Sequence, residues 1–291
     1  IGTIIYKTIF NNSSSLRYLF ETLLIEYSIN TVYLVLLTSF FSLIFGIFPA
    51  WFISMYKFKG RKFYDLFLFL PLAIPTYIMA FTYGDFLSYT GPIQTFFRNN
   101  FNEIYYLFNK DYLQIEILAI ILGLALYPYI YSVSRVSFSL IGLNYINLSK
   151  NLGLSSLKTF VKIILPLSSP AIFSGLFLVI MEVLNEYGAV KYFGVNTYTT
   201  GIFRAWFSMN DISSAIILAL ILMLLVFFLF FLEKNYHSKY KFNYSSNTKI
   251  QNLSEVSLVK KVIIHITCLI PFLLGFIIPL FYTINNSISI Y

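Results

Sequence analysis

Long apolar runs fill most of this chain, and short polar stretches separate them. A helix needs roughly 20 apolar residues to cross ~30 Å of hydrocarbon. Six stretches are long enough: 31–55, 67–84, 115–133, 171–190, 212–232 and 262–288. They lack the every-second-residue alternation of membrane β-barrel strands, and lipid tolerates only helices or closed barrels. The pattern therefore predicts an all-α polytopic membrane protein.

The composition supports this prediction and excludes several other classes. Hydrophobic residues make up 58% of the chain and charged residues only 11%, with a mean hydropathy of +0.76, which leaves too little polar surface for a soluble globule. The single cysteine, Cys268, excludes a disulfide framework and a thiolate metal cluster. The chain has no G-x-x-x-x-G-K-[ST] nucleotide loop, and its two histidines, His237 and His265, form no metal motif. We therefore expect no enzyme activity, no bound cofactor and no fixed metal in this chain.

The basic residues predict how the spans are oriented. Fourteen of the 20 lysines and arginines lie in the loops after the first, third and fifth spans. The positive-inside rule places these loops in the cytoplasm. The net charge of +8 then reflects topology and contact with anionic lipid headgroups, and no nucleic-acid partner is needed to explain it.

The polar stretch before the fourth span has the pattern of two short amphipathic helices. The first apolar stripe is Ile141, Tyr145, Leu148 and Leu152, and the second is Leu154, Leu157, Phe160, Val161 and Ile164. We expect Gly153 to end the first helix in a left-handed conformation, and Leu165-Pro166 to close the segment before the span. By itself, such a pattern also fits an interfacial helix that lies on the bilayer.

The spacing within this segment carries a resemblance to a known family. Gly153 is followed by nine residues, then Ile163, one residue, and Leu165-Pro166. This resembles the cytoplasmic loop of the permease subunits of binding-protein-dependent ABC importers, which reads E-A-A, three residues, Gly, nine residues, I-x-L-P. Here Asn147-Leu148-Ser149 replaces the E-A-A triplet. The resemblance implies that these seven residues couple the permease to an ABC ATPase, through backbone and apolar contacts where the acidic residue is missing.

Residues 51–94 and 185–207 resemble the ferric-iron permeases of this family, which look like two six-helix halves fused in one chain. The implied fold is the type I ABC importer transmembrane domain, a MetI-like helical fold. The implied domains are an external segment 1–28 after a missing first helix, a first permease half 29–232 with five spans and a coupling loop 134–169, a cytoplasmic basic linker 233–261, and the first helix of a truncated second half, 262–291. A start at Ile1 rather than Met also suggests a fragment.

Several polar or helix-breaking residues inside the spans are candidates for the translocation path. Glu182 and Glu186 are four apart and would share one helix face, with Asn185 beside them. A carboxylate at mid-membrane costs ~2.5–3.5 kcal/mol, so it faces either a polar path or a hydrogen-bonding neighbour. Pro71 and Pro75 would kink the second span. They either line a pathway or are ordinary prolines of a membrane helix.

The outer loop 191–211 is rich in Tyr, Thr, Gly and Asn. The resemblance implies that it faces a docked binding protein and the outer gate, with Gly194, Tyr198 and Arg204 as candidates. A re-entrant structural turn would explain the same residues.

The resemblance implies a multi-pass permease subunit in a bacterial inner membrane, partnered by ABC ATPase subunits that use ATP. A periplasmic or lipid-anchored binding protein would deliver ferric iron. Polyamine, thiamine and phosphonate importers have related permeases. A rival of another class is an ion-coupled secondary transporter that uses Glu182, and a membrane-embedded enzyme would need a cluster of His, Asp and Ser that is not visible.

Overall fold

The computed structural model describes residues 23–101, 111–141, 149, 151, 153–239 and 254–290. Two predicted coupling residues, Asn147 and Leu148, therefore lie outside the described residues, as do Tyr145 and Leu152 of the first apolar stripe.

Within the described residues, five helices are long and apolar enough to cross a membrane. They are Leu24–Met55, Ile115–Leu140, Ser156–Asn185, Ile212–Tyr236 and Leu258–Ile288. A sixth crossing is present if the bent pair Arg61–Ala73 and Thr76–Asn100 counts as one span. The all-helical polytopic fold is thus confirmed. Four of the six predicted stretches each lie within one long helix, and a fifth, 171–190, runs five residues past the end of its helix at Asn185.

The second predicted span turns a right angle instead of forming a kinked helix. It consists of α4 (Arg61–Phe67), the 3-10 turn η2 (Leu70–Ala73), α5 (Thr76–Leu87) and α6 (Pro92–Asn100), and the two parts are bent by 90°. The ring of Pro75 crowds the residue before it, so Ile74 leaves the helical region at φ −102° and ψ 119°. The expectation of a single kinked helix was therefore wrong.

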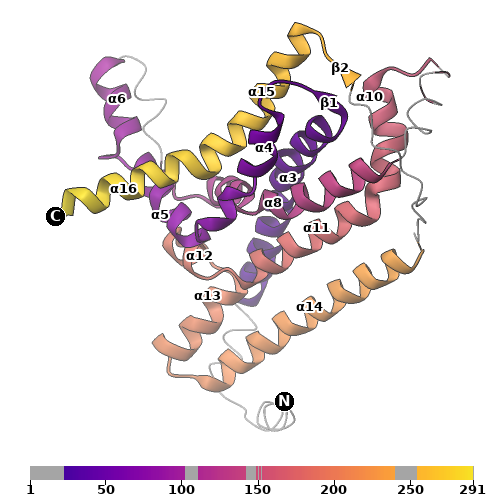
Figure 1. The fold of residues 1–291 in the computed structure, drawn as a ribbon. Helices are drawn as coiled ribbons and strands as arrows, with labels where there is room; N and C mark the ends of the chain where they lie inside the picture. Colours follow the sequence, from indigo (N-terminus) through magenta and orange to yellow (C-terminus); the bar gives the residue numbers. More distant parts are fainter. Residues whose placement is uncertain are drawn as a thin grey trace.

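Helices α3 (Leu24–Met55), α8 (Ile115–Leu140) and α11 (Leu165–Asn185) form the centre of the molecule (Figure 1). Glycine allows their close approach, because a Cβ on Gly123 would lie 2.7 Å from Cβ of Phe41, and one on Gly175 3.0 Å from Cα of Ile130. In the apolar window of α8, 72% of the residues are buried, whereas in that of α14 (Ile212–Lys239) only 11% are buried. Helix α14 therefore runs along the outside and offers most of its surface to lipid or to another chain.

The fourth span continues without a break from the polar loop that precedes it. Helix α10 (Ser156–Thr159), the π-turn η3 (Phe160–Ile164) and α11 form one 30-residue helix. The Leu165 N–H donates to the Phe160 carbonyl, five residues back. The wider turn precedes Pro166, which has no N–H to donate and would clash with a regular helix turn. The expectation that Leu165-Pro166 closes a separate loop helix was therefore wrong.

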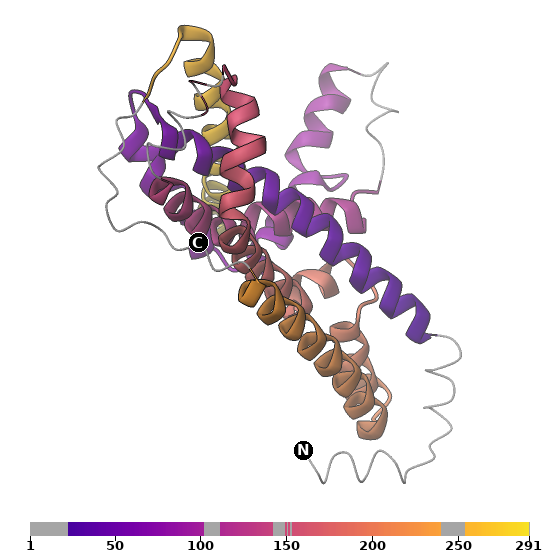
Figure 2. The ribbon, with the colours of Figure 1, turned by 90° about the vertical axis from the view of Figure 1, so that its right-hand side faces the viewer.

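Short elements lie at the two ends of the bundle. Short helices α12 (Gly188–Tyr192), α13 (Tyr198–Phe203) and the π-turn η4 (Arg204–Ser208) occupy one end. Strands β1 (Tyr56–Lys57) and β2 (Ser254–Glu255) pair in parallel beside α10 at the other, as Figures 1 and 2 show. The chain ends with α15 (Leu258–Phe272), the π-turn η5 (Leu273–Ile277) and α16 (Ile278–Ile290).

The predicted basic linker, 233–261, is shorter in the structure. Helix α14 extends to Lys239, and α15 already begins at Leu258. Both ends of the predicted linker therefore continue the neighbouring spans as helix. Span three is extended in the same way, since α8 reaches Leu140, well into the loop predicted to begin at residue 134.

Candidate functional site

Gly153 forms the turn that its position predicted. Its φ is +70°, in the left-handed region, and the Leu154 N–H donates to the Ser149 carbonyl at 3.0 Å. This bond over five residues is the closing bond of a Schellman motif, in which glycine follows the end of a helix. A Cβ at Gly153 would touch nothing within 4 Å, so it is the backbone conformation and not a lack of space that demands glycine.

A buried hydroxyl pair joins the two sides of this turn. The Thr159 hydroxyl donates to the Ser149 hydroxyl at 3.1 Å, and Ser149 is fully buried. The predicted coupling residue Ser149 is thus held against the first turn of the long helix. Ser155 begins that helix, where its side chain accepts a hydrogen bond from the Lys158 N–H at 3.4 Å.

Aromatic packing anchors the N-terminal end of the long helix, which we call its inner end after the predicted orientation, to the first span. The Phe160 ring stacks on Trp51 of α3, with centroids 4.2 Å apart and planes 19° apart. Phe160 and Ile164 are buried, whereas Leu157 and Val161 are 65% and 50% exposed. The predicted second stripe is therefore divided between two faces of the helix, because the π-turn changes the helical phase within it.

The other matched positions lie along the same helix. Ile163 and Leu165 are half-buried, and Pro166 is exposed. The structure thus places Ser149 and Gly153 at the turn, and Ile163, Leu165 and Pro166 on the rigid element that follows it.

Glu182 and Glu186 do not share a helix face, so that prediction was wrong. Helix α11 ends at Asn185, and Glu186 already has extended backbone, with φ −69° and ψ 123°. Glu182 and Asn185 are exposed, and Glu182 accepts a hydrogen bond from the Tyr129 hydroxyl of α8 at 3.2 Å. Within the described residues, no three His, Cys, Asp or Glu side chains form a group that could hold a metal ion.

Glu186 organises the corner that follows α11. Its carboxylate accepts hydrogen bonds from the Thr76 hydroxyl of α5 and from the Ala189 N–H of α12, the latter at 2.9 Å. Its backbone carbonyl accepts from the Thr199 hydroxyl at 2.8 Å. Glu186 thus caps α12 with its carboxylate and also binds α5 and α13. These contacts fit the alternative in which Glu186 is a structural hydrogen-bonding residue.

The two prolines of the second span have different surroundings. Pro71 is buried and close to Gly275 of η5, where an added Cβ would lie 3.0 Å from the Pro71 ring. Pro75 is exposed at the right-angle corner. Pro71 therefore packs the second span against the last one.

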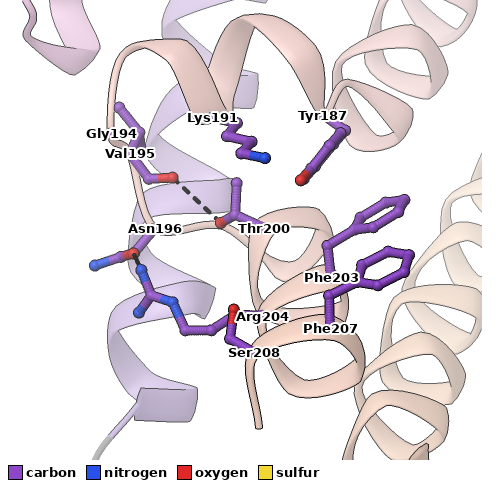
Figure 3. Close-up of a pocket in the computed structure, with 10 residues that line it drawn as sticks. All are labelled: Tyr187, Lys191, Gly194, Val195, Asn196, Thr200, Phe203, Arg204, Phe207 and Ser208. Atoms are coloured by element: carbon purple, nitrogen blue, oxygen red, sulfur yellow. Dashed lines mark hydrogen bonds between the residues drawn. The ribbon is translucent and has the colours of Figure 1, made fainter. Parts of the chain in front are cut away.

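A cavity of about 390 Å³ opens beside the predicted outer loop (Figure 3). Its lining residues are Tyr187, Lys191, Gly194, Val195, Asn196, Thr200, Phe203, Arg204, Phe207 and Ser208. Among the described residues that line it, two are cations and none is a carboxylate, and the Glu26 carboxylate accepts a hydrogen bond from the lining Asn196 side chain at 2.8 Å. Stacked rings form one wall, with the Tyr187 and Phe203 centroids 3.9 Å apart, and the Lys191 ammonium lies 5.4 Å from the Tyr187 ring centre. We call this cavity the outer pocket.

The three predicted outer residues take three different positions. Gly194 has φ +68°, and a Cβ there would meet nothing within 4 Å. Arg204 is exposed at the outer pocket and donates to the Asn196 side chain at 2.9 Å. Tyr198 is buried, and its hydroxyl shares a 2.7 Å hydrogen bond with Ser28 of α3, which makes it a structural anchor.

Sequence reasoning missed several residues of these regions. Lys191, Asn196 and Thr200 lie in the predicted outer loop 191–211, but none of them was singled out as a site residue. The Trp51–Phe160 stack joins residues far apart in the chain, and no local periodicity predicts such a pair.

Comparison with known proteins places the chain in a family. Residues 42–241, more than half of the chain, match the family described as binding-protein-dependent transport system inner membrane component. The Fe(3+)-transport system permease protein FbpB 2 of Haemophilus influenzae is 27% identical over 77% of this chain and 41% of its own length. The sulfate transport system permease protein CysT of Salmonella typhimurium is 27% identical over 54% of each chain, and that of Escherichia coli is 26% identical over the same shares.

The chain thus spans about half or less of the length of these relatives, all of which are transport permeases. The family match includes the Gly153 turn, the long helix and the outer pocket, so it covers both ends of the bundle. This chain belongs to the family of binding-protein-dependent transport system inner membrane components.

Proposed function

We propose that this chain is the membrane-spanning subunit of an ATP-driven importer of a bacterial inner membrane. ABC ATPase subunits would bind the Ser149–Pro166 segment on the cytoplasmic side, and a binding protein would deliver substrate at the outer pocket. The observation that carries the proposal is the unbroken helix from Ser156 to Asn185. It begins just after the Gly153 turn and ends one residue before the Glu186 corner.

This helix offers a physical route for coupling. Its inner end packs through Phe160 on Trp51, and its outer end leads into the hydrogen bonds of Glu186. Coupling requires an element that makes different contacts in two states. A displacement of the inner end would reach the outer corner through a single rigid element, and ATPase closure could thereby change access from outside.

Ferric iron is the substrate that we propose first. The iron permease relative matches 77% of this chain, whereas the sulfate relatives match 50–56%. Hard cations prefer oxygen ligands. Glu182 and Asn185 supply oxygens on the exposed face near the outer end of α11, and among the described residues the Tyr129 hydroxyl is the hydrogen-bond partner of Glu182.

An oxyanion such as sulfate is the second candidate, and the outer pocket favours it. Lys191 and Arg204 are the charged side chains among the described residues that line the pocket, and the nearby Glu26 carboxylate is already bonded to Asn196, so the pocket suits a negative charge. The same two cations would equally suit an acidic side chain on a delivery protein.

Uptake assays with two paired variants separate the candidates. In vesicles that contain the full-length permease, its ATPase and its binding protein, we expect Glu182→Gln to reduce uptake of labelled iron. The double variant Lys191→Gln, Arg204→Gln should reduce iron uptake less when the binding protein is present at a saturating concentration. If the native permease takes up labelled sulfate, and if the double variant loses this uptake while Glu182→Gln keeps it, the substrate is an oxyanion and not iron.

The energy source has its own test. Uptake should require the partner ATPase and ATP, and should survive an ionophore that collapses the ion gradients. Uptake that persists without the ATPase and stops with the ionophore would favour an ion-coupled secondary transporter that uses Glu182.

A further inference from the structure

A second cavity lies at the opposite end of the molecule from the outer pocket. Its volume is about 470 Å³, and it opens between the end of α3, the start of α10 and the start of α15. Its lining residues are Trp51, Phe52, Tyr56, Ser155, Ser156, Leu157, Val256, Lys260, Ile263 and Ile264. We call it the inner cleft. Ser155, Ser156 and Leu157 on its rim belong to the segment proposed to bind the ATPase, whereas the cavity itself has no assigned role in the proposed transport cycle.

The lining of the inner cleft has the chemistry of an amphiphile site. Aromatic rings and branched aliphatic side chains form its walls, with Trp51 and Ile264 almost fully buried. The polar groups are the Ser155 and Ser156 hydroxyls and the Lys260 ammonium. No carboxylate is among the described side chains that line it. An apolar chain with a negative head would find a complementary surface for each part.

The surroundings place the inner cleft at a membrane boundary. At the start of α15, Leu258 and Val259 are 80% and 71% exposed, directly beside the exposed Lys260 and Lys261. Exposed apolar and basic side chains occur together where a helix enters the headgroup region. Further exposed lysines lie in the neighbouring segments, at Lys59, Lys62, Lys158 and Lys162. The positive-inside rule assigns this end to the cytoplasmic leaflet, whose lipids carry negative charge.

We propose that the inner cleft binds one anionic phospholipid of the cytoplasmic leaflet. An acyl chain lies between Trp51 and Ile263, and the phosphate meets Lys260 and the two serine hydroxyls. Basic pockets between membrane helices on this side recognise anionic headgroups in this way. The bound lipid touches the helix that follows the Gly153 turn, so its occupancy stabilises that helix start against α3 and α15.

The test uses the full-length permease assembled with its ATPase and purified in mild detergent. Native mass spectrometry measures retention of added phosphatidylglycerol against phosphatidylcholine. We expect preferential retention of one phosphatidylglycerol, reduced about fivefold by Lys260→Gln. The matched control is Lys261→Gln, because Lys261 is the next residue, is also an exposed lysine, and is not among the residues that line the cleft.

A second variant tests the apolar part independently of charge. Ser156→Trp fills the cleft while it keeps Lys260, and it should displace the lipid to the same extent. Equal losses in Lys260→Gln and Lys261→Gln would overturn the proposal, since they would indicate diffuse attraction to a basic surface. Equal retention of the two lipids would overturn it as well. Unchanged retention in Ser156→Trp would also overturn it, because the lipid would then bind elsewhere.

Discussion

The two ends of the long helix Ser156–Asn185 are held in different ways. At the inner end, contact with the first span is an aromatic stack between Phe160 and Trp51, which has no fixed donor or acceptor. At the outer end, Glu186 makes directional hydrogen bonds to Thr76, Ala189 and Thr199. Apolar contacts are non-directional and tolerate sliding, whereas hydrogen bonds fix a geometry. The difference indicates that the inner end can adjust to a partner while the outer end keeps its register.

The largest expected effect tests whether these ends lie on opposite sides of the membrane. A cysteine at Ser155 should react with an impermeant thiol reagent only from the cytoplasm, and one at Ser208 only from outside. Both side chains are exposed, whereas Thr199 in the same outer loop is buried and would react poorly. Native Cys268 is buried, so its background labelling should be low. Labelling of both positions from one side would overturn the topology.

Gly153→Val should produce the next largest effect. A β-branched residue at φ +70° costs ~1–2 kcal/mol, or about tenfold in the population of this turn. We expect uptake to fall by about that factor while ATP hydrolysis and membrane levels remain.

Gly194→Val is its matched control at the outer end. That glycine has φ +68° and equally open surroundings, so the local strain is the same. It should leave the response of the ATPase to the permease unchanged. Identical phenotypes for the two variants would show general destabilisation in place of a coupling role for Gly153.

Replacement of Glu186 should separate structural from transport roles. In Glu186→Ala the N–H of Ala189 loses its cap and Thr76 loses its acceptor, at a cost of ~1 kcal/mol or more. We expect a melting temperature lower by a few degrees in detergent, measured by thermal unfolding. Glu182→Ala, which removes only the bond from Tyr129, should change stability much less. The reverse order would assign the structural role to Glu182.

The smallest expected effect concerns the hydroxyl pair at the inner turn. Ser149→Ala or Thr159→Val should each cost about 1 kcal/mol, because each leaves a buried hydroxyl without this partner. The double variant should cost less than the sum, since neither hydroxyl remains. If the losses of stability of the two single variants add up to that of the double variant in a double-mutant cycle, measured by thermal unfolding, the two side chains contribute independently.

Local physics made part of this structure predictable from the sequence. Spans follow from the length of an apolar run, and Gly153 follows from the preference of helix ends for glycine. Pro75 predicts an interruption of its span, but the same proline is compatible with a kinked helix and with a right-angle corner. The choice depends on distant packing, such as that of Pro71 near Gly275.

The outer site was less predictable for the same reason. Glu186 lies within the predicted fourth span, 171–190, yet it leaves the helix, and Thr76 and Thr199 bind it from other elements. Lys191 and Arg204 meet at one pocket only after α12 and α13 have turned the chain. No periodicity in the sequence encodes that meeting.

The π-turn Phe160–Ile164 has a consequence for the register of the long helix. A π-turn accommodates about one extra residue, and one residue rotates a helix by about 100°. Phe160 at the start of the turn, which stacks on Trp51, and the helical residues before it are therefore out of phase with a regular extension of α11. Removal of a single residue inside the turn would rotate the inner end by about 100°, a little more than a quarter of a revolution, while the outer end keeps its bonds. The alignment of the two ends thus depends on the number of residues in this turn as well as on their chemistry.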